Sequence, residues 1–319
     1  MKKLPIRLTL ALLLISILPL PARAIKTLIP MGEVVGLELY NDTVTIAGFE
    51  KGSRAEEAGL QTGDRLLAVD GNPVKTAGDI RAALERSDGT VELTVRRKDQ
   101  LLQKKLEPLI TDSGPKLGIY LRQGITGIGT LTYYDPETGI FGSLGHSVND
   151  HEGTVVAMTA GNLYSAAVAS VRKGRCGDPG QLMGALRSAE PIGILQRNTV
   201  QGVFGKLNKT VEKQPLPAAS DSIRPGNATI LSTVSGTAVQ SYSVEILKIY
   251  PTSRQSGRNM LIKITDPALL ETIGGIVQGM SGSPIIQDGK LIGAVTHVLV
   301  NDPTTGYGIF IENMLDAAA

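Results

Sequence analysis

The residues best suited to chemistry are Gly279-Met280-Ser281-Gly282-Ser283-Pro284, which predict a tight turn around a serine hydroxyl. A serine that attacks a carbonyl group generates a negatively charged oxygen, and two backbone N–H groups aimed at one point stabilise that charge. The amides of Gly279 and Ser281 are the candidates for this oxyanion hole. Glycine suits the turn because a side chain extending beyond Cβ would obstruct the donors. The competing interpretation is a Gly/Ser-rich turn before a hairpin, without catalysis.

A serine nucleophile needs a general base, and histidine suits that role because its unperturbed pKa lies near 6.5. The sequence contains three histidines. His146 is the predicted base, because it lies where a strand end turns at glycine into a polar loop. His151 follows in the same loop and is predicted to be exposed. His297 lies within the apolar run 294–298 and is predicted to pack or to form a structural hydrogen bond.

A third group must fix the tautomer of the base, and a carboxylate usually does so. Asp266, Asp150 and Asp302 compete for this role. Asp266 precedes Pro267, so it also fits a helix N-cap followed by proline at the first helical position. The residues by themselves leave this choice open.

Length and composition predict two compact domains rich in short strands. The chain has 319 residues, of which 42% are hydrophobic, with 37 glycines and few aromatic residues. The net charge is +2 and the two signs are interleaved, so we expect no nucleic-acid partner. Cys176 is the single cysteine and has no partner for an intramolecular disulfide; we expect it to be a partly buried structural residue.

Residues 1–24 predict an export signal. Basic residues at positions 2, 3 and 7 precede an apolar run over 8–20, and Ala22-Arg23-Ala24 has the form of a signal-peptidase site. The run is shorter than the roughly 20 residues of a spanning helix, which favours cleavage over retention as a membrane anchor.

Residues 28–108 predict a small α/β domain, and Ser53–Gly71 resembles the middle of a PDZ domain. PDZ domains add an extended peptide to a sheet edge and hold its terminal carboxylate on backbone amides. Val35-Gly36-Leu37 is the predicted carboxylate-binding loop, since it has the apolar-Gly-apolar form. The alternative is a packing domain that binds no free C-terminus.

Residues 116–319 predict a second domain of short strands, either a sandwich or a double barrel. Asp288-Gly289 predicts a hairpin turn between two apolar runs. The stretch 206–225, which contains Pro215 and Pro217, predicts the crossover between two β halves.

The loop around Ser281 resembles the nucleophile loop of chymotrypsin-like peptidases. Together with residues 274–286, 293–298 and 301–308, it resembles the stage IV sporulation protein B peptidase family of endospore-forming bacteria. The resemblance implies a mainly β fold, in which a chymotrypsin-like double β-barrel is preceded by a PDZ domain. It also implies a serine endopeptidase with Ser281, His146 and Asp266 as catalytic residues, and neither metal nor cofactor.

The same resemblance implies a place in sporulation. Members are secreted from the forespore into the space between its two membranes, where they cleave themselves and the extracytoplasmic part of a membrane-anchored regulator. That cleavage relieves inhibition of an intramembrane metalloprotease, which then processes a late sigma factor. Two alternatives remain at this point: a non-catalytic PDZ adaptor, and a general envelope quality-control serine protease.

Overall fold

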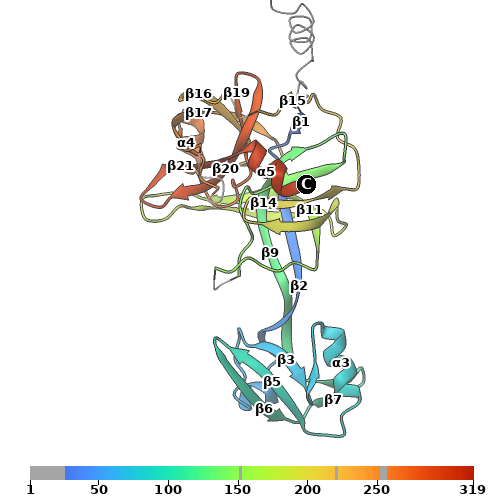
Figure 1. The fold of residues 1–319 in the computed structure, drawn as a ribbon. Helices are drawn as coiled ribbons and strands as arrows, with labels where there is room; N and C mark the ends of the chain where they lie inside the picture. Colours follow the sequence, from blue (N-terminus) through green and yellow to red (C-terminus); the bar gives the residue numbers. More distant parts are fainter. Residues whose placement is uncertain (1–25, 151–152, 220–221, 252–256) are drawn as a thin grey trace, which may run out of the picture.

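The computed structural model describes residues 26–150, 153–219, 222–251 and 257–319. The predicted export segment and His151 therefore lie outside the described residues. Figure 1 shows a larger β-rich body and a smaller domain, joined by two long strands, β2 (Val34–Phe49) and β9 (Ile119–Tyr134). No described helix has the length and apolar character needed to cross a membrane.

A first barrel of six strands closes on itself through the pairing of β2 with β9. Its strand order is β9, β10, β14, β13, β11 and β2. Alternate residues of β2 point inward, so Val35, Leu37 and Leu39 pack against Phe141 and Leu163 in its core. The other strands are β10 (Ile140–Ser143), β11 (Ala160–Arg172), β13 (Gly193–Thr199) and β14 (Gly202–Leu207).

A second barrel closes in the order β16, β17, β18, β21, β20 and β19. Its core contains Ile230, Val244, Ile262, Ile285 and Val295, all at most 1% exposed. Asp288-Gly289 joins β19 to β20 as the sequence predicts. The elements are β16 (Gly226–Ser232), β17 (Gln240–Ile249), β18 (Met260–Ile264), α4 (Pro267–Ile273), β19 (Pro284–Gln287), β20 (Lys290–Leu299) and β21 (Asp302–Phe310).

The two barrels follow each other along the chain, and the segment between β14 and β16 connects them, which confirms the predicted crossover. The C-terminal helix α5 (Ile311–Ala318) buries Ile311 and Met314 in a cluster shared by both barrels. The remaining short strands are β1 (Thr27–Pro30), β12 (Gln181–Leu186) and β15 (Leu216–Pro217).

The smaller domain has a separate core built on the outer halves of β2 and β9. Helix α3 (Ala77–Glu85) starts at a capping box between Thr76 and Asp79 and buries Ile80 and Leu84 against the sheet. The other elements are α2 (Arg54–Glu57), β3 (Arg65–Val69), β4 (Asn72–Pro73), β5 (Val91–Arg97), β6 (Gln100–Leu106), β7 (Leu109–Thr111) and β8 (Gly114–Lys116).

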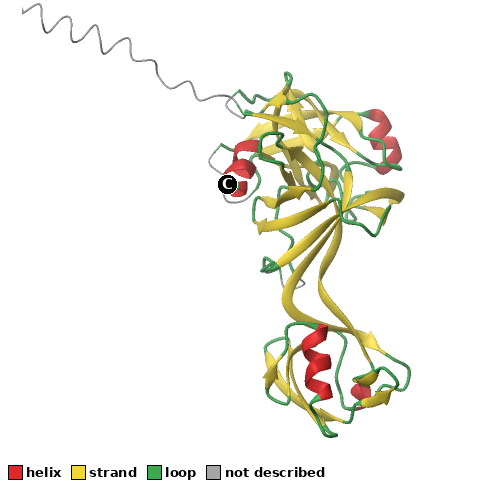
Figure 2. Ribbon diagram, turned by 90° about the vertical axis from the view of Figure 1, so that its right-hand side faces the viewer, coloured by secondary structure: helices red, strands yellow, loops and turns green. Residues whose placement is uncertain are grey.

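The smaller domain is an insertion within the first barrel. Strands β2 and β9 pair from Val34↔Thr130 in the barrel to Phe49↔Ile119 in the smaller domain, with a register shift between Leu39 and Val44. Figure 2 shows both strands running between the two bodies. Residues 34–39 thus lie in the barrel, and β1 pairs with the barrel strand β9, which differs from the expected division into 28–108 and 116–319, because long-range strand pairing places these residues there.

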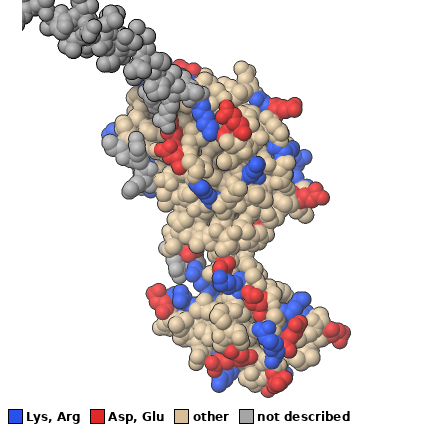
Figure 3. Space-filling model, turned by 45° about the vertical axis from the view of Figure 1, so that its right-hand side comes forward, with Lys and Arg blue, Asp and Glu red and all other residues tan. Residues whose placement is uncertain are grey.

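Charged side chains show no gathering of one sign on the face drawn in Figure 3. Lys and Arg alternate with Asp and Glu over the smaller domain, and the visible face of the barrels has wide uncharged areas. Cys176 is exposed, so the expectation of partial burial is wrong; it lies in a turn between β11 and β12.

Candidate active site

Ser281 lies in the connection between α4 and β19, at the edge of the second barrel. Helix α4 ends at Gly274 in the left-handed conformation, and the chain then winds through further turns to Ser281. The Oγ atom of Ser281 donates a hydrogen bond to the carbonyl of Thr296 on β20, at 2.8 Å. The hydroxyl is therefore held by the second barrel in this structure.

Hydrogen bonds from the first barrel hold the backbone around Ser281. Thr130 of the first barrel donates its N–H to the carbonyl of Ser281 at 3.0 Å and its hydroxyl to that of Gly279 at 2.8 Å. Within the described ranges, the amides of Gly279 and Ser281 form no hydrogen bond. Thr130 thus fixes the carbonyls of Gly279 and Ser281, while the amides of the same two residues remain available as donors. Both features fit the predicted oxyanion hole.

His146 lies at the edge of the first barrel, just after β10. Leu144 and Gly145 both adopt positive φ angles, which turn the chain out of the strand. The Nδ1 atom of His146 lies 2.8 Å from the carbonyl of Ser147. Because that carbonyl only accepts, the proton resides on Nδ1 and the lone pair on Nε2. Burial lowers the pKa of His146 below its ordinary 6.5, although the Ser147 hydrogen bond acts in the opposite direction.

Two glycines allow these loops to meet. A Cβ atom on Gly145 would lie 2.8 Å from Cγ2 of Thr296 in the second barrel. A Cβ atom on Gly282 would lie 2.1 Å from the backbone oxygen of Thr130 in the first. The backbones of the histidine loop and the serine loop thus pack directly against the opposite barrel, where larger residues would separate them.

His146 and Ser281 line one cavity of about 380 Å³ between the barrels. Leu37, Leu39 and Ile128 contribute apolar side chains, and Gln278 lies at the same cavity. The structure thus brings together the predicted nucleophile and the predicted base at a site that accepts an apolar group.

The predicted third residue, Asp266, lies elsewhere in the described structure. It is the N-cap of α4: Oδ1 accepts from the amide of Leu269 at 3.0 Å and Oδ2 from that of Ser243 at 3.3 Å. No hydrogen bond joins it to His146 among the described residues, so helix capping is the role that its described contacts support.

The two competing carboxylates have other partners. Asp150 forms an ion pair with Arg65, and Asp302 accepts from Thr304 and Thr305.

His297 is the neighbour of His146 that sequence reasoning missed. Its ring centroid lies 5.2 Å from that of His146. Its Nδ1 atom is buried and has no hydrogen-bond partner among the described residues. Burial, followed by the proximity of His146 and Arg258, lowers the pKa of His297 to about 4. The pairing of β20 with β21 shifts register next to His297, and the apolar run around this histidine gives no signal of that shift.

The predicted carboxylate-binding loop, Val35-Gly36-Leu37, is wrong. These residues form the middle of β2, where β9 pairs with one edge and β11 with the other. Val35 is 1% exposed and Leu37 is 3% exposed. An apolar-Gly-apolar strand of a barrel has the same sequence form as the loop, so the pattern alone could not separate them.

A second apolar-Gly-apolar segment, Leu117-Gly118-Ile119, lies where such a loop belongs. Gly118 has a φ of +67°, and the segment leads directly into the outer half of β9. Among the described strands, residues 119–123 of β9 pair only with β2, which leaves their other edge open. Helix α3 lies against the preceding strand β8. An open edge beside a helix is the arrangement in which PDZ domains accept a peptide strand.

The structure has two packed six-stranded barrels, and a histidine of one and a serine of the other line a shared cavity. This arrangement defines a chymotrypsin-like serine peptidase, here with an inserted PDZ domain. Residues 114–315 match the family described as SpoIVB peptidase S55, and residues 45–97 match the PDZ domain family. The chain belongs to the SpoIVB peptidase S55 family.

Other similarities cover parts of the chain. A protein named as a zinc metalloprotease, CPE1693 of Clostridium perfringens, is 36% identical over 70 residues, 22% of this chain and 21% of that protein. Rho GTPase-activating protein 21-B of Xenopus laevis is 43% identical over 61 residues, 18% of this chain and 3% of that protein. The chain spans about a fifth of the first relative's length. In the described ranges, no group of three His, Cys, Asp or Glu residues is placed to hold a metal ion.

Among solved structures, the active form of the Rv3671c protease from M. tuberculosis is 15% identical. The similarity covers 61% of this chain and 73% of that one, with a TM-score of 0.38. The PDZ domain of an SdrC-like protein from Listeria monocytogenes is 24% identical and covers 25% of this chain and 88% of that one, with a TM-score of 0.23.

Proposed function

We propose that this peptidase is exported during sporulation, cleaves itself, and cleaves the extracytoplasmic part of a membrane-anchored regulator. Cleavage of that regulator activates an intramembrane metalloprotease, which then processes a late sigma factor. Family membership supports the pathway, and the basic, apolar and Ala-x-Ala segments of residues 1–24 support export into the space between the forespore membranes. The observation that carries the chemistry is the shared cavity of Ser281 and His146.

The proposed reaction is peptide hydrolysis through an acyl-enzyme. Ser281 Oγ leaves the Thr296 carbonyl, passes its proton to Nε2 of His146 and attacks the carbonyl carbon of the scissile bond. The amides of Gly279 and Ser281 hold the resulting oxyanion. His146 then gives the proton to the departing amine, and water, activated by the same nitrogen, hydrolyses the ester.

In the proposed reaction, the carbonyl of Ser147 orients His146. It accepts a hydrogen bond from Nδ1 of His146, which leaves Nε2 free to accept a proton. Asp266 stabilises the start of α4, which precedes the nucleophile turn. The apolar lining of the cavity favours substrates with an apolar side chain next to the scissile bond.

Mass spectrometry of the mature protein tests the proposal. Wild type, Ser281→Ala and the control Ser222→Ala are incubated alone and with the extracytoplasmic segment of a candidate regulator. Ser222 is an exposed hydroxyl that contacts Lys290. We expect defined fragments from wild type and Ser222→Ala and none from Ser281→Ala.

Unfolded casein serves as a second substrate in the same experiment. Indiscriminate digestion of casein with no defined cut in the regulator would favour a general quality-control protease instead.

A further inference from the structure

The PDZ domain touches the loop that carries His146. Nη2 of Arg65, the first residue of β3, lies 3.1 Å from Oδ2 of Asp150, which follows His146 by four positions. The side chains of Arg65 and Asp150 are only 25% and 17% exposed. Partial burial reduces solvent screening, so this pair is stronger than an exposed ion pair.

Asp150 fixes the conformation of its own loop. Its Oδ1 atom accepts from the amide of Thr154 at 3.0 Å, and its amide donates to the carbonyl of Thr154 at 2.9 Å. On the side nearer His146, the amide of Val148 donates to Asn198 Oδ1 at 2.8 Å. Ser147, whose carbonyl orients His146, thus lies in a segment held by the first barrel at Val148 and by the PDZ domain at Asp150.

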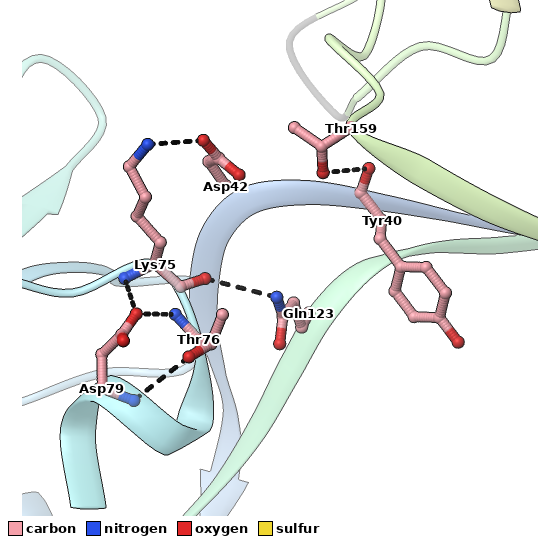
Figure 4. Close-up of polar contacts among 7 residues, drawn as sticks. All are labelled: Tyr40, Asp42, Lys75, Thr76, Asp79, Gln123 and Thr159. Carbon is pink, nitrogen blue, oxygen red and sulfur yellow. Dashed lines mark hydrogen bonds and ion pairs between the residues drawn. The ribbon is translucent and has the colours of Figure 1, made fainter. Parts of the chain in front are cut away.

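Other contacts keep the PDZ domain in place (Figure 4). The Nζ atom of Lys75 lies 2.7 Å from the carboxylate of Asp42 on β2, and Gln123 of β9 donates to the carbonyl of Lys75 at 3.3 Å. Farther along, the hydroxyl of Thr159 donates to the carbonyl of Tyr40 on β2 at 3.3 Å. These bonds connect the start of α3 to the paired strands, and the paired strands to the end of the histidine loop.

We propose that Arg65 is a positioning residue of the peptidase: through Asp150, the PDZ domain holds the His146 loop in its catalytic geometry. This inference rests on the proposed roles of Ser281 and His146. Neither Arg65 nor Asp150 lines the cavity, so the pair acts on the orientation of the base rather than on substrate contact. Loss of the pair lowers kcat and leaves KM nearly unchanged.

The kinetic test is a double-mutant cycle on a peptide substrate. Arg65→Gln and Asp150→Asn each lower kcat about tenfold, whereas the double variant is no worse than either, because one interaction is lost in all three. Asn at position 150 keeps an oxygen for the Thr154 amide, and Arg65→Lys retains the charge and most of the activity.

The matched control is Arg54→Gln, which breaks the exposed pair of Arg54 with Glu107 inside the PDZ domain and keeps wild-type kcat. Additive losses in the double variant, or equal kcat for Arg65→Gln and Arg54→Gln, would overturn the proposal.

Hydrogen exchange tests the positioning role of Arg65 without a measurement of catalysis. In the Ser281→Ala background, Arg65→Gln raises the exchange rates of the amides at 148, 150, 153 and 154 several-fold relative to Arg54→Gln. Unchanged rates reject the positioning role even if the chain proves inactive in every assay, so failure of this inference and failure of the peptidase assignment are separate results.

Discussion

The imidazole rings of His146 and His297 lie 5.2 Å apart between centroids, with their planes inclined by 42°. Protonating both rings at that separation is unfavourable, because like charges repel in a partly desolvated site. Burial, followed by the proximity of His146 and Arg258, lowers the pKa of His297 to about 4, so His297 is neutral at neutral pH. The base thus has a polar, uncharged neighbour.

We predict that kcat/KM falls as the solution is acidified, with a midpoint below pH 6.5. A general base must be neutral to act, and burial lowers the pKa of His146, so activity persists to a more acid pH than for an unperturbed imidazole. His297→Asp should move the midpoint to higher pH, since an anion stabilises the imidazolium, whereas His297→Asn should not. Initial rates from pH 4 to 8 measure this, and a midpoint at or above pH 7 in wild type would contradict it.

Asp266→Ser separates the two roles of this aspartate. Serine caps helices nearly as well as aspartate but carries no charge, so we expect near-wild-type melting and activity. Asp266→Ala should cost about 1 kcal/mol of stability through loss of the cap. A loss of kcat on the order of 10⁴-fold in Asp266→Ser, with unchanged melting, would instead establish Asp266 as the orienting carboxylate.

Gly282→Ala should abolish activity. Its φ of +97° strains an L-residue, and the new Cβ would lie 2.1 Å from the Thr130 oxygen, so the serine loop must move away from the first barrel. Gly289→Ala is the control, because Gly289 also has a positive φ, +73°, but faces open space. We expect it to lose about 1 kcal/mol of stability and to keep its activity. Assays of kcat and thermal melting on both variants suffice, and an active Gly282→Ala would show that the loop tolerates displacement.

The PDZ domain should bind peptides through their C-terminal carboxylate at Leu117-Gly118-Ile119. A peptide that ends in a free acid should bind more tightly than its C-terminal amide, because the loop amides would lose an anionic acceptor. Fluorescence anisotropy with the Ser281→Ala protein measures both. Equal affinities would favour a domain that packs without holding a free C-terminus.

The sequence predicts the local parts of the candidate site. Ser281 and His146 each lie in a short glycine-containing segment whose chemistry is readable without the rest of the chain, and Asp266-Pro267 carries its N-cap signal in two residues. The hairpin at Asp288-Gly289 was predictable for the same reason.

The features that the sequence did not reveal depend on contacts between residues that are far apart in the chain. Val35-Gly36-Leu37 becomes a barrel strand only because β9 and β11, far along the chain, flank it. His297 reaches His146 through a register shift that no local pattern encodes. The contact of Arg65 with Asp150 exists only because the PDZ domain is inserted into the first barrel.

That insertion also bears on how the chain folds. The first barrel closes between residues 34–39 and 125–130, and the whole PDZ domain lies between them in sequence. Closing so long a flexible loop costs conformational entropy and slows strand pairing. Once the PDZ domain has folded, Val44 and Gln123 are already paired. The barrel portions of β2 and β9 are then adjacent and can pair residue by residue, as the two strands of a hairpin do. The PDZ domain is therefore expected to form first and to serve as the nucleus on which the first barrel assembles.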